Sequence, residues 1–144
     1  MNQLNCAFIV DDDPIHQFGM KVLMEKLEFS KKVMVFYNGQ EAIDALLDML
    51  RAKKQFPNVI FLDLNMPIKD GWGFLDDFVQ IPHSNREKVL IYVVSSSISP
   101  LDQERAKEYA VVSNYLFKPI DESDLKNILN DNRNKNLAIN RGEL

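Results

Sequence analysis

The sequence comprises 144 residues, the length of one domain with a substantial core. It is 46% hydrophobic and 26% charged, which excludes a disordered chain, and it has no apolar run near the roughly 20 residues of a membrane span. The net charge of −4 gives no reason to expect nucleic acid as a partner, and the single cysteine excludes an intrachain disulfide. Without a recognisable secretory signal, we expect a cytoplasmic protein with neither a nucleic-acid nor a membrane partner.

Taken in chain order, short apolar segments alternate with segments of helical periodicity. Residues 6–10 form an apolar run that ends in acids, which predicts a strand. Apolar side chains at helical spacing, such as Ile15, Phe18 and Val22, predict a helix over 14–27, with Asp13 as N-cap and Pro14 as first helical residue. In the same way, strands are predicted at 33–36, 59–62, 89–94 and 114–117, and helices at 42–50, 71–79, 100–110 and 125–129. The stretch 81–85 predicts a loop.

This alternation of five strands and five helices predicts an α/β fold with a doubly wound, five-stranded parallel sheet. Several strands are continuous apolar runs, as expected when helices cover both faces of the sheet. We expect one domain over residues 1–130, followed by a loose polar tail over 131–144 and no output domain. An open sheet of this kind binds ligands beyond the carboxyl ends of its strands.

Polar residues follow four of the five predicted strands. They are Asp11 and Asp12, Asp63, Ser95 and Lys118. Two carboxylates about 4 Å apart repel by about 4 kcal/mol at an effective dielectric near 20, so this cluster favours a cation. Oxygen ligands with open positions suit Mg²⁺. A carboxylate beside Mg²⁺, with Lys and Ser donors nearby, can attack phosphorus.

Each of these residues also has an ordinary structural explanation when taken alone. Aspartates are common where strands end in turns, and a lysine is by default a solvated surface residue. His16 and His83 are interpreted as exposed residues without a role, and Trp72 as partial packing. The joint occurrence of carboxylates, hydroxyl and lysine at successive strand ends is what favours a site.

Four motifs carry a family resemblance: "FIVDDDP", "FLDLNMPIKDGW", "YVVSSS" and "YLFKP". With them, the sequence resembles the receiver domain of a two-component response regulator over residues 7–129. The resemblance is to a single-domain receiver of the chemotaxis type, and it implies the flavodoxin-like (βα)5 receiver fold. One departure is the stretch "AVVSN" at 110–114, where the family usually has a Gly-Ala-type sequence.

The resemblance implies a phosphoacceptor and a metal site. Asp63 would accept a phosphoryl group from a phosphohistidine on a histidine kinase or a histidine phosphotransfer protein. Asp12, Asp63 and the backbone carbonyl of Asn65 would bind Mg²⁺, with Asp11 assisting through water. The protein would be no enzyme with an external substrate, because it would lose the phosphoryl group by slow self-hydrolysis.

The resemblance also implies residues that bind the phosphoryl group or change position in response to it. Ser95 and Lys118 would hold its oxygens, Lys118–Pro119 would be a cis peptide, and Tyr115 would be the switch aromatic. Asn65 and Ser97 would tune the lifetime of the phosphorylated state. We expect an unidentified downstream protein target, and a possible homodimer, to use the surface formed by the helix at 100–110, the strand at 114–117 and the last helix.

Two other functions fit parts of this pattern. Enzymes of the haloacid-dehalogenase type also combine a strand-end Asp with Mg²⁺, Ser or Thr, and Lys. Their nucleophile normally has a second Asp two residues later and lies near the start of the domain, whereas Asn65 stands at that position here and Asp63 is mid-chain. An adaptor that binds without phosphorylation leaves the full set of reactive residues unexplained.

Overall fold

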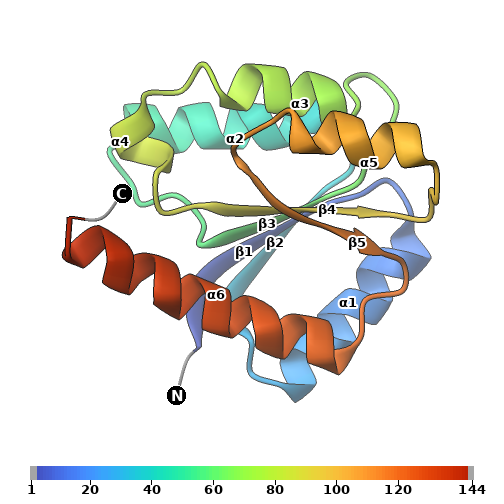
Figure 1. Cartoon of the computed structure of the whole chain (residues 1–144), viewed down its shortest axis with the longest axis horizontal. Helices are drawn as coiled ribbons and strands as arrows, with labels where there is room; N and C mark the ends of the chain where they lie inside the picture. The colour runs from blue at the N-terminus through green and yellow to red at the C-terminus, as the bar shows by residue number, and fades with distance from the viewer. Residues whose placement is uncertain (1–2, 143–144) are drawn as a thin grey trace.

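The computed structural model describes residues 3–142, which form a five-stranded parallel sheet between two layers of helices (Figure 1). The order of the strands in the sheet is β2-β1-β3-β4-β5. Their bounds are β1 Leu4–Val10, β2 Ser30–Phe36, β3 Val59–Leu62, β4 Leu90–Ser95 and β5 Val112–Phe117. The predicted α/β fold with a doubly wound parallel sheet is confirmed.

Six helices cover the two faces of the sheet in the described part of the chain. They are α1 Pro14–Lys26, α2 Gly39–Arg51, α3 Gly71–Phe78, α4 His83–Arg86, α5 Pro100–Lys107 and α6 Glu122–Asn140. Helices α1 and α6 lie on one face, and α2 to α5 lie on the other (Figure 1). No helix between residues 3 and 142 has both the length and the apolar character that crossing a membrane requires.

The continuous apolar strands are explained by the two cores. In β1, Phe8 and Val10 belong to the core under α2 and α3, whereas Ala7 and Ile9 belong to the core under α1 and α6. Successive side chains of a strand point to opposite faces, so a strand that is covered on both sides is apolar at every position. All four residues of β3 are buried for this reason.

Helix α1 turns a different face to the sheet than its apolar residues suggest. Gln17, Met20 and Met24 are its buried residues, while Ile15 is 83% and Phe18 70% exposed. Val22 is also exposed. The helix itself is where the sequence predicts it, and Asp13 caps it by accepting hydrogen bonds from the N–H groups of Ile15 and His16.

Two sequence predictions are wrong. Residues 83–86, which overlap the loop predicted at 81–85, form the short helix α4. Arg86 holds this helix by donating a hydrogen bond from Nε to the carbonyl of Ile81 at 2.8 Å. The predicted loose tail is helical up to Asn140, because α6 continues past residue 130. Contacts with β4 and the residue before it explain this second error: Tyr92 Oη donates to Asp131 at 2.7 Å, and Lys135 Nζ donates to the carbonyl of Val89 at 3.3 Å.

The hydrogen bond between Tyr92 and Asp131 gives a prediction for stability. Replacing Tyr92 with Phe removes the hydroxyl donor and leaves the exposed Asp131 to water, so the free energy of unfolding should fall by about 1 kcal/mol. Urea denaturation measures the change, and Tyr37→Phe, at a side chain that is 52% exposed, is the matched control with no expected effect. Equal stability of Tyr92→Phe and the wild type would contradict the attachment of α6 to β4.

Candidate functional site

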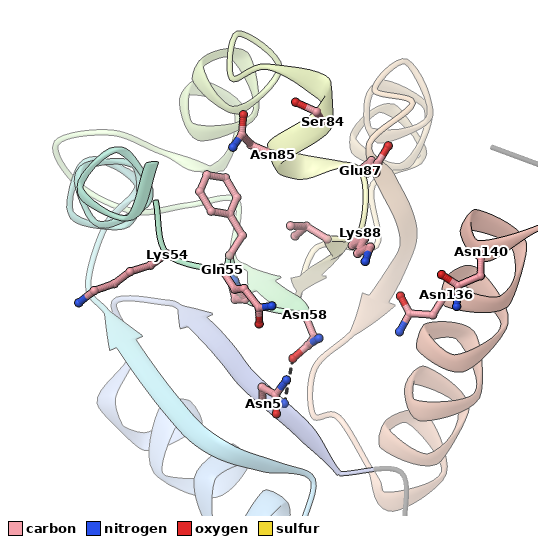
Figure 2. A pocket seen from close by; sticks show the side chains of 13 residues that line it. Asn5, Lys54, Gln55, Asn58, Ser84, Asn85, Glu87, Lys88, Asn136 and Asn140 are labelled. Atoms are coloured by element: carbon pink, nitrogen blue, oxygen red, sulfur yellow. Dashed lines mark hydrogen bonds between the residues drawn. The ribbon is translucent and has the colours of Figure 1, made fainter. Parts of the chain in front are cut away.

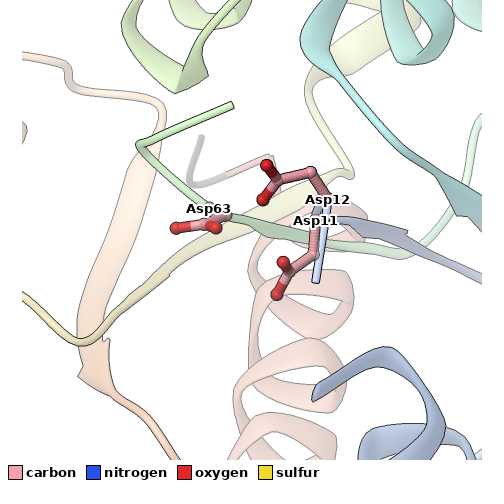
Figure 3. Close-up of side chains that lie close together, drawn as sticks. All are labelled: Asp11, Asp12 and Asp63. Atoms are coloured by element: carbon pink, nitrogen blue, oxygen red, sulfur yellow. The ribbon is translucent and has the colours of Figure 1, made fainter. Parts of the chain in front are cut away.

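The carboxyl ends of the strands bring the predicted polar residues to one edge of the sheet. Asp11 and Asp12 follow β1, and Asp63 follows the adjacent β3. One carboxylate oxygen of each of these three residues lies within 4.8 Å of the others. Figure 3 shows the three side chains close together. Backbone hydrogen bonds fix this register, since the Asp63 N–H donates to Val10 at 2.9 Å.

Lys118 lies between two of the three acids. Its Nζ is 3.0 Å from Asp11 Oδ2 and 3.3 Å from Asp63 Oδ2. The strand pairing places it there, because the N–H of Lys118, one residue past β5, donates to the carbonyl of Ser95, the last residue of β4, at 3.0 Å. When all are ionised, three carboxylates and one ammonium leave two negative charges, so the oxygen donors present fit a divalent cation.

Asp11, Asp63 and Lys118 have shifted pKa values. Burial raises the pKa of Asp63, the charge of Asp11 raises it further, and Lys118 only partly opposes this. Burial also disfavours the charged form of Asp11, but hydrogen bonds from His16, the Asp13 N–H and Lys118 outweigh it and lower the pKa of Asp11. Burial favours the neutral form of Lys118, yet the two carboxylates prevail and raise its pKa.

The loop after Asp63 packs closely against the start of α3. The Leu64 N–H donates to Asp63 Oδ1 at 2.8 Å, and the Gly71 N–H donates to the Leu64 carbonyl at 3.0 Å. A Cβ at Gly71 would lie 2.4 Å from the carbonyl oxygen of Asp63, which no ordinary contact allows. The glycine in the "KDGW" sequence is therefore required by the backbone that carries Asp63.

The hydroxyl residue and the aromatic residue meet in the loop after β4. Ser95 is buried, and its Oγ accepts from the Ser97 N–H at 3.0 Å. Tyr115 Oη donates to the Ser97 carbonyl at 3.0 Å. The Ser97 hydroxyl donates to Asp102 at 2.8 Å, so it is engaged with the first turn of α5. The Lys118 to Pro119 peptide bond is cis.

The sequence interpretation of His16 as exposed is wrong. Its side chain is only 10% exposed, and Nδ1 lies 2.7 Å from Asp11 Oδ2. The neighbouring Gln17, also buried, donates from Nε2 to the Asp11 carbonyl. Asn65 and Asp12, by contrast, are exposed at the mouth of the site, and His83 lies in α4 with a side chain that is 68% exposed.

Another concave region lies away from these residues. A polar pocket of about 570 Å³ is found at the amino-terminal edge of the sheet (Figure 2). Asn5, near the start of β1, and Asn58, just before β3, belong to its lining. The N–H of Asn5 donates to Asn58 Oδ1 at 2.9 Å, and Asn136 and Asn140 of α6 also line the pocket. Its lining includes none of the acids at the other edge, so the acidic cluster is the candidate site.

Comparison with known proteins decides the family. The family model of the response regulator receiver domain matches residues 7–130. The chain belongs to this family. It is thus a receiver domain of two-component systems, a class that differs from enzymes with substrate turnover.

Several solved receiver structures are similar over most of their length. A two component response regulator from Cytophaga hutchinsonii is 28% identical, covers 92% of this chain and 98% of its own, and has a TM-score of 0.84. A response regulator receiver protein from Dyadobacter fermentans is 28% identical, with coverages of 89% and 97% and a TM-score of 0.77. The Mn²⁺-bound form of response regulator Rcp1 is 25% identical, with coverages of 88% and 90% and a TM-score of 0.63.

The curated relatives differ in length from this receiver. The probable methanogenesis regulatory protein FilR2 of Methanothrix harundinacea is 28% identical over 133 residues, which are 92% of this chain and 84% of that protein. An uncharacterized response regulatory protein of Vibrio cholerae is 28% identical over 126 residues, which are 87% of this chain and 43% of that protein. The chain therefore spans less than half of some relatives that it matches.

The raised pKa of Asp63 predicts the effect of removing its charge on the stability of the receiver. A carboxyl whose pKa is higher in the folded than in the unfolded state loses stability as the pH rises from its unfolded value, near 3.8, through its folded value. In EDTA at pH 7, Asp63→Asn should therefore melt a few degrees above the wild type, and the difference should shrink toward pH 4. The exposed Asp44→Asn is the control, and a lower melting temperature of Asp63→Asn at pH 7 would contradict the prediction.

Proposed function

We propose that this receiver is the phosphoacceptor of a histidine-to-aspartate phosphorelay and that Asp63 is its phosphorylation site. An oxygen of the Asp63 carboxylate attacks phosphorus, the bond between phosphorus and the imidazole nitrogen of a phosphohistidine breaks, and an acyl phosphate forms. The observation that carries the proposal is Lys118, whose Nζ lies 3.0 Å from Asp11 and 3.3 Å from Asp63 in a pocket of carboxylates. Asp63 also follows β3, which pairs with β4, and β4 ends at the buried hydroxyl residue Ser95.

The proposed cofactor is Mg²⁺. Asp12, Asp63 and the carbonyl of Asn65 would hold it, with Asp11 assisting through water. Clustered carboxylate oxygens within 4.8 Å of one another support this set. When bound, the ion supplies positive charge to the phosphoryl oxygens, which reduces the repulsion between the donor and the acidic site.

Two protein groups would stabilise the product. The Lys118 ammonium reaches Asp63 already, so a short movement takes it from the carboxylate to a phosphoryl oxygen. The Ser95 hydroxyl would donate to another oxygen, while its Oγ goes on accepting from the Ser97 N–H. A movement of Ser95 toward the phosphoryl group would therefore pull on the loop whose carbonyl Tyr115 contacts, which supports Ser95 and Tyr115 as the switch residues.

The phosphodonor is proposed to be a histidine kinase or a histidine phosphotransfer protein that docks on α1. The exposed side chains of Ile15, Phe18 and Val22 lie on this helix next to the acidic site. A groove of about 440 Å³ joins Ile15 of α1 to Lys118 and Pro119. Contiguous exposed apolar residues mark interaction surfaces, and this one would bring a phosphohistidine to the mouth of the site. We propose a cytoplasmic location, in keeping with such a donor.

Asn65 and Ser97 are proposed to tune how long the acyl phosphate lasts. Hydrolysis needs a water molecule in line with the bond to Asp63, and the exposed amide of Asn65 can orient it. Because the Ser97 hydroxyl donates to Asp102, it would act by fixing the loop rather than by holding water.

The output surface is proposed to consist of α5, β5 and α6, where a downstream target or a second copy of the chain would bind. Leu101 is 80% and Phe117 45% exposed on this surface. Helix α5 is weakly held by the core, since Ala106 is the one buried residue described within it. A shift in the position of α5 would then change the free energy of partner binding by about 1–3 kcal/mol, the range typical of allosteric coupling.

Intact mass spectrometry tests the phosphorylation site. With Mg²⁺ and a small phosphodonor, the wild type should gain one phosphoryl group, and Asp63→Asn should gain none because the attacking carboxylate is missing. The exposed Asp44→Asn should be labelled like the wild type. A stable acyl phosphate on Asp63→Asn at wild-type yield would refute the assignment, and sustained turnover of a phosphate ester would instead indicate an enzyme.

Amide hydrogen exchange tests the output surface. Adding beryllofluoride and Mg²⁺, which stand in for the phosphoryl group, should change protection in α5 and β5, because Ser95 and Tyr115 both contact the backbone of Ser97. Ser95→Ala should lose most of this change while keeping the fold. Changes confined to α1 and α2 would show that the signal leaves by another surface.

A further inference from the structure

His16 is a largely buried histidine that uses one ring nitrogen and has no partner for the other among the described residues. Its side chain is 10% exposed, and Nδ1 lies 2.7 Å from Oδ2 of Asp11. Nε2 is buried and has no hydrogen-bond partner among the described residues. Since the Asp11 carboxylate can only accept, Nδ1 carries the hydrogen and donates it.

The oxygen that His16 contacts is shared with Lys118. Asp11 Oδ2 accepts from His16 and lies 3.0 Å from Lys118 Nζ, while Oδ1 accepts from the Asp13 N–H at 2.9 Å. Asp11 is 2% exposed, so water is a poor substitute for any donor that leaves. A buried carboxylate oxygen that loses its last donor is strongly destabilised.

A phosphoryl group on Asp63 would draw Lys118 away from Asp11. The group adds negative charge on the Asp63 side, and Lys118 has to reach its oxygens. With His16 in place, Asp11 Oδ2 keeps a donor when Lys118 moves. Without His16, the same movement would leave that oxygen with no side-chain donor, and Lys118 would be held back by Asp11.

We propose that His16 is a positioning residue that releases Lys118 from Asp11 when a phosphoryl group arrives. The inference rests on the proposed function, because it requires Asp63 to carry the phosphoryl group. It assigns to His16 neither metal ligation nor proton transfer; the imidazole acts on the reaction through the Asp11 carboxylate. The buried Gln17 amide, which donates to the Asp11 carbonyl, holds the same residue from its main-chain side.

Three substitutions separate this role from simple filling of the core. The amide nitrogen of Asn branches from Cγ as Nδ1 does, so His16→Asn can keep the bond to Asp11. The amide nitrogen of Gln lies one bond farther, where Nε2 has no partner, so His16→Gln is larger yet loses the bond. His16→Leu keeps apolar volume and removes all donors. His83→Asn, in exposed α4, is the matched control.

The measurement is the affinity for beryllofluoride at saturating Mg²⁺, with melting temperatures recorded alongside. His16→Asn and His83→Asn should bind within about twofold of the wild type. His16→Gln and His16→Leu should bind on the order of tenfold more weakly, the effect expected for one hydrogen bond to a charged group. Mn²⁺ affinity without beryllofluoride, followed by electron paramagnetic resonance, should change less than beryllofluoride affinity in the same variants.

The outcomes distinguish this inference from the proposed function. No binding of beryllofluoride by the wild type would overturn both. Normal binding by the wild type with equal affinities across the His16 variants would overturn the role of His16 alone. The role of His16 would also be overturned if His16→Asn weakened beryllofluoride binding as much as His16→Leu does, with each loss following the fall in melting temperature. That result would indicate a packing role. If His16→Leu does not fold, the Asn and Gln pair decides.

Discussion

The arrangement of the site depends on one ammonium group held between two buried carboxylates. Asp11 and Asp63 are 2% and 7% exposed, and without Lys118 their charges would face each other in a poorly hydrated space. Their pKa values diverge because their donors differ. Three donors outweigh burial and lower the pKa of Asp11. Asp63 has fewer donors, so burial and the charge of Asp11 raise its pKa. The less stabilised carboxylate is the one proposed to react, so the electrostatic cost of folding the site is concentrated on its nucleophile.

The sequence predicts this convergence because a parallel sheet turns strand ends into neighbours. Each residue alone is a weak signal, but Asp63 and Lys118 are 55 positions apart and still form one ion pair through the order of β1, β3, β4 and β5. The face of α1 could not be predicted in the same way. Apolar residues occur around the whole helix, and only the packing of Met20 and Met24 against the sheet decides that Phe18 is exposed.

Two further failures of prediction have a common physical cause. The burial of His16 and the helical continuation of α6 both depend on polar contacts, with Asp11 just after β1 and with Tyr92 in β4. Polar contacts of this kind leave no apolar period in the sequence, so periodicity predicts a loose tail and an exposed histidine. An acidic capping pair, Asp121 and Asp124, marks where α6 starts, but no local signal marks how far it runs.

Helix α5 shows how such polar contacts can also serve a switch. Its first turn is tied to the loop after β4 by Asp102, and its far end is tied to α3, where the Arg105 guanidinium lies 4.3 Å from the centre of the Trp72 ring and Tyr109 Oη donates to Asp76 at 2.6 Å. Trp72 itself follows the glycine that packs on the Asp63 backbone. Both ends of α5 are therefore connected to segments next to the acidic site, while the core holds it weakly. Contacts worth about 1 kcal/mol each can be exchanged without unfolding the sheet, so the position of α5 costs little to change.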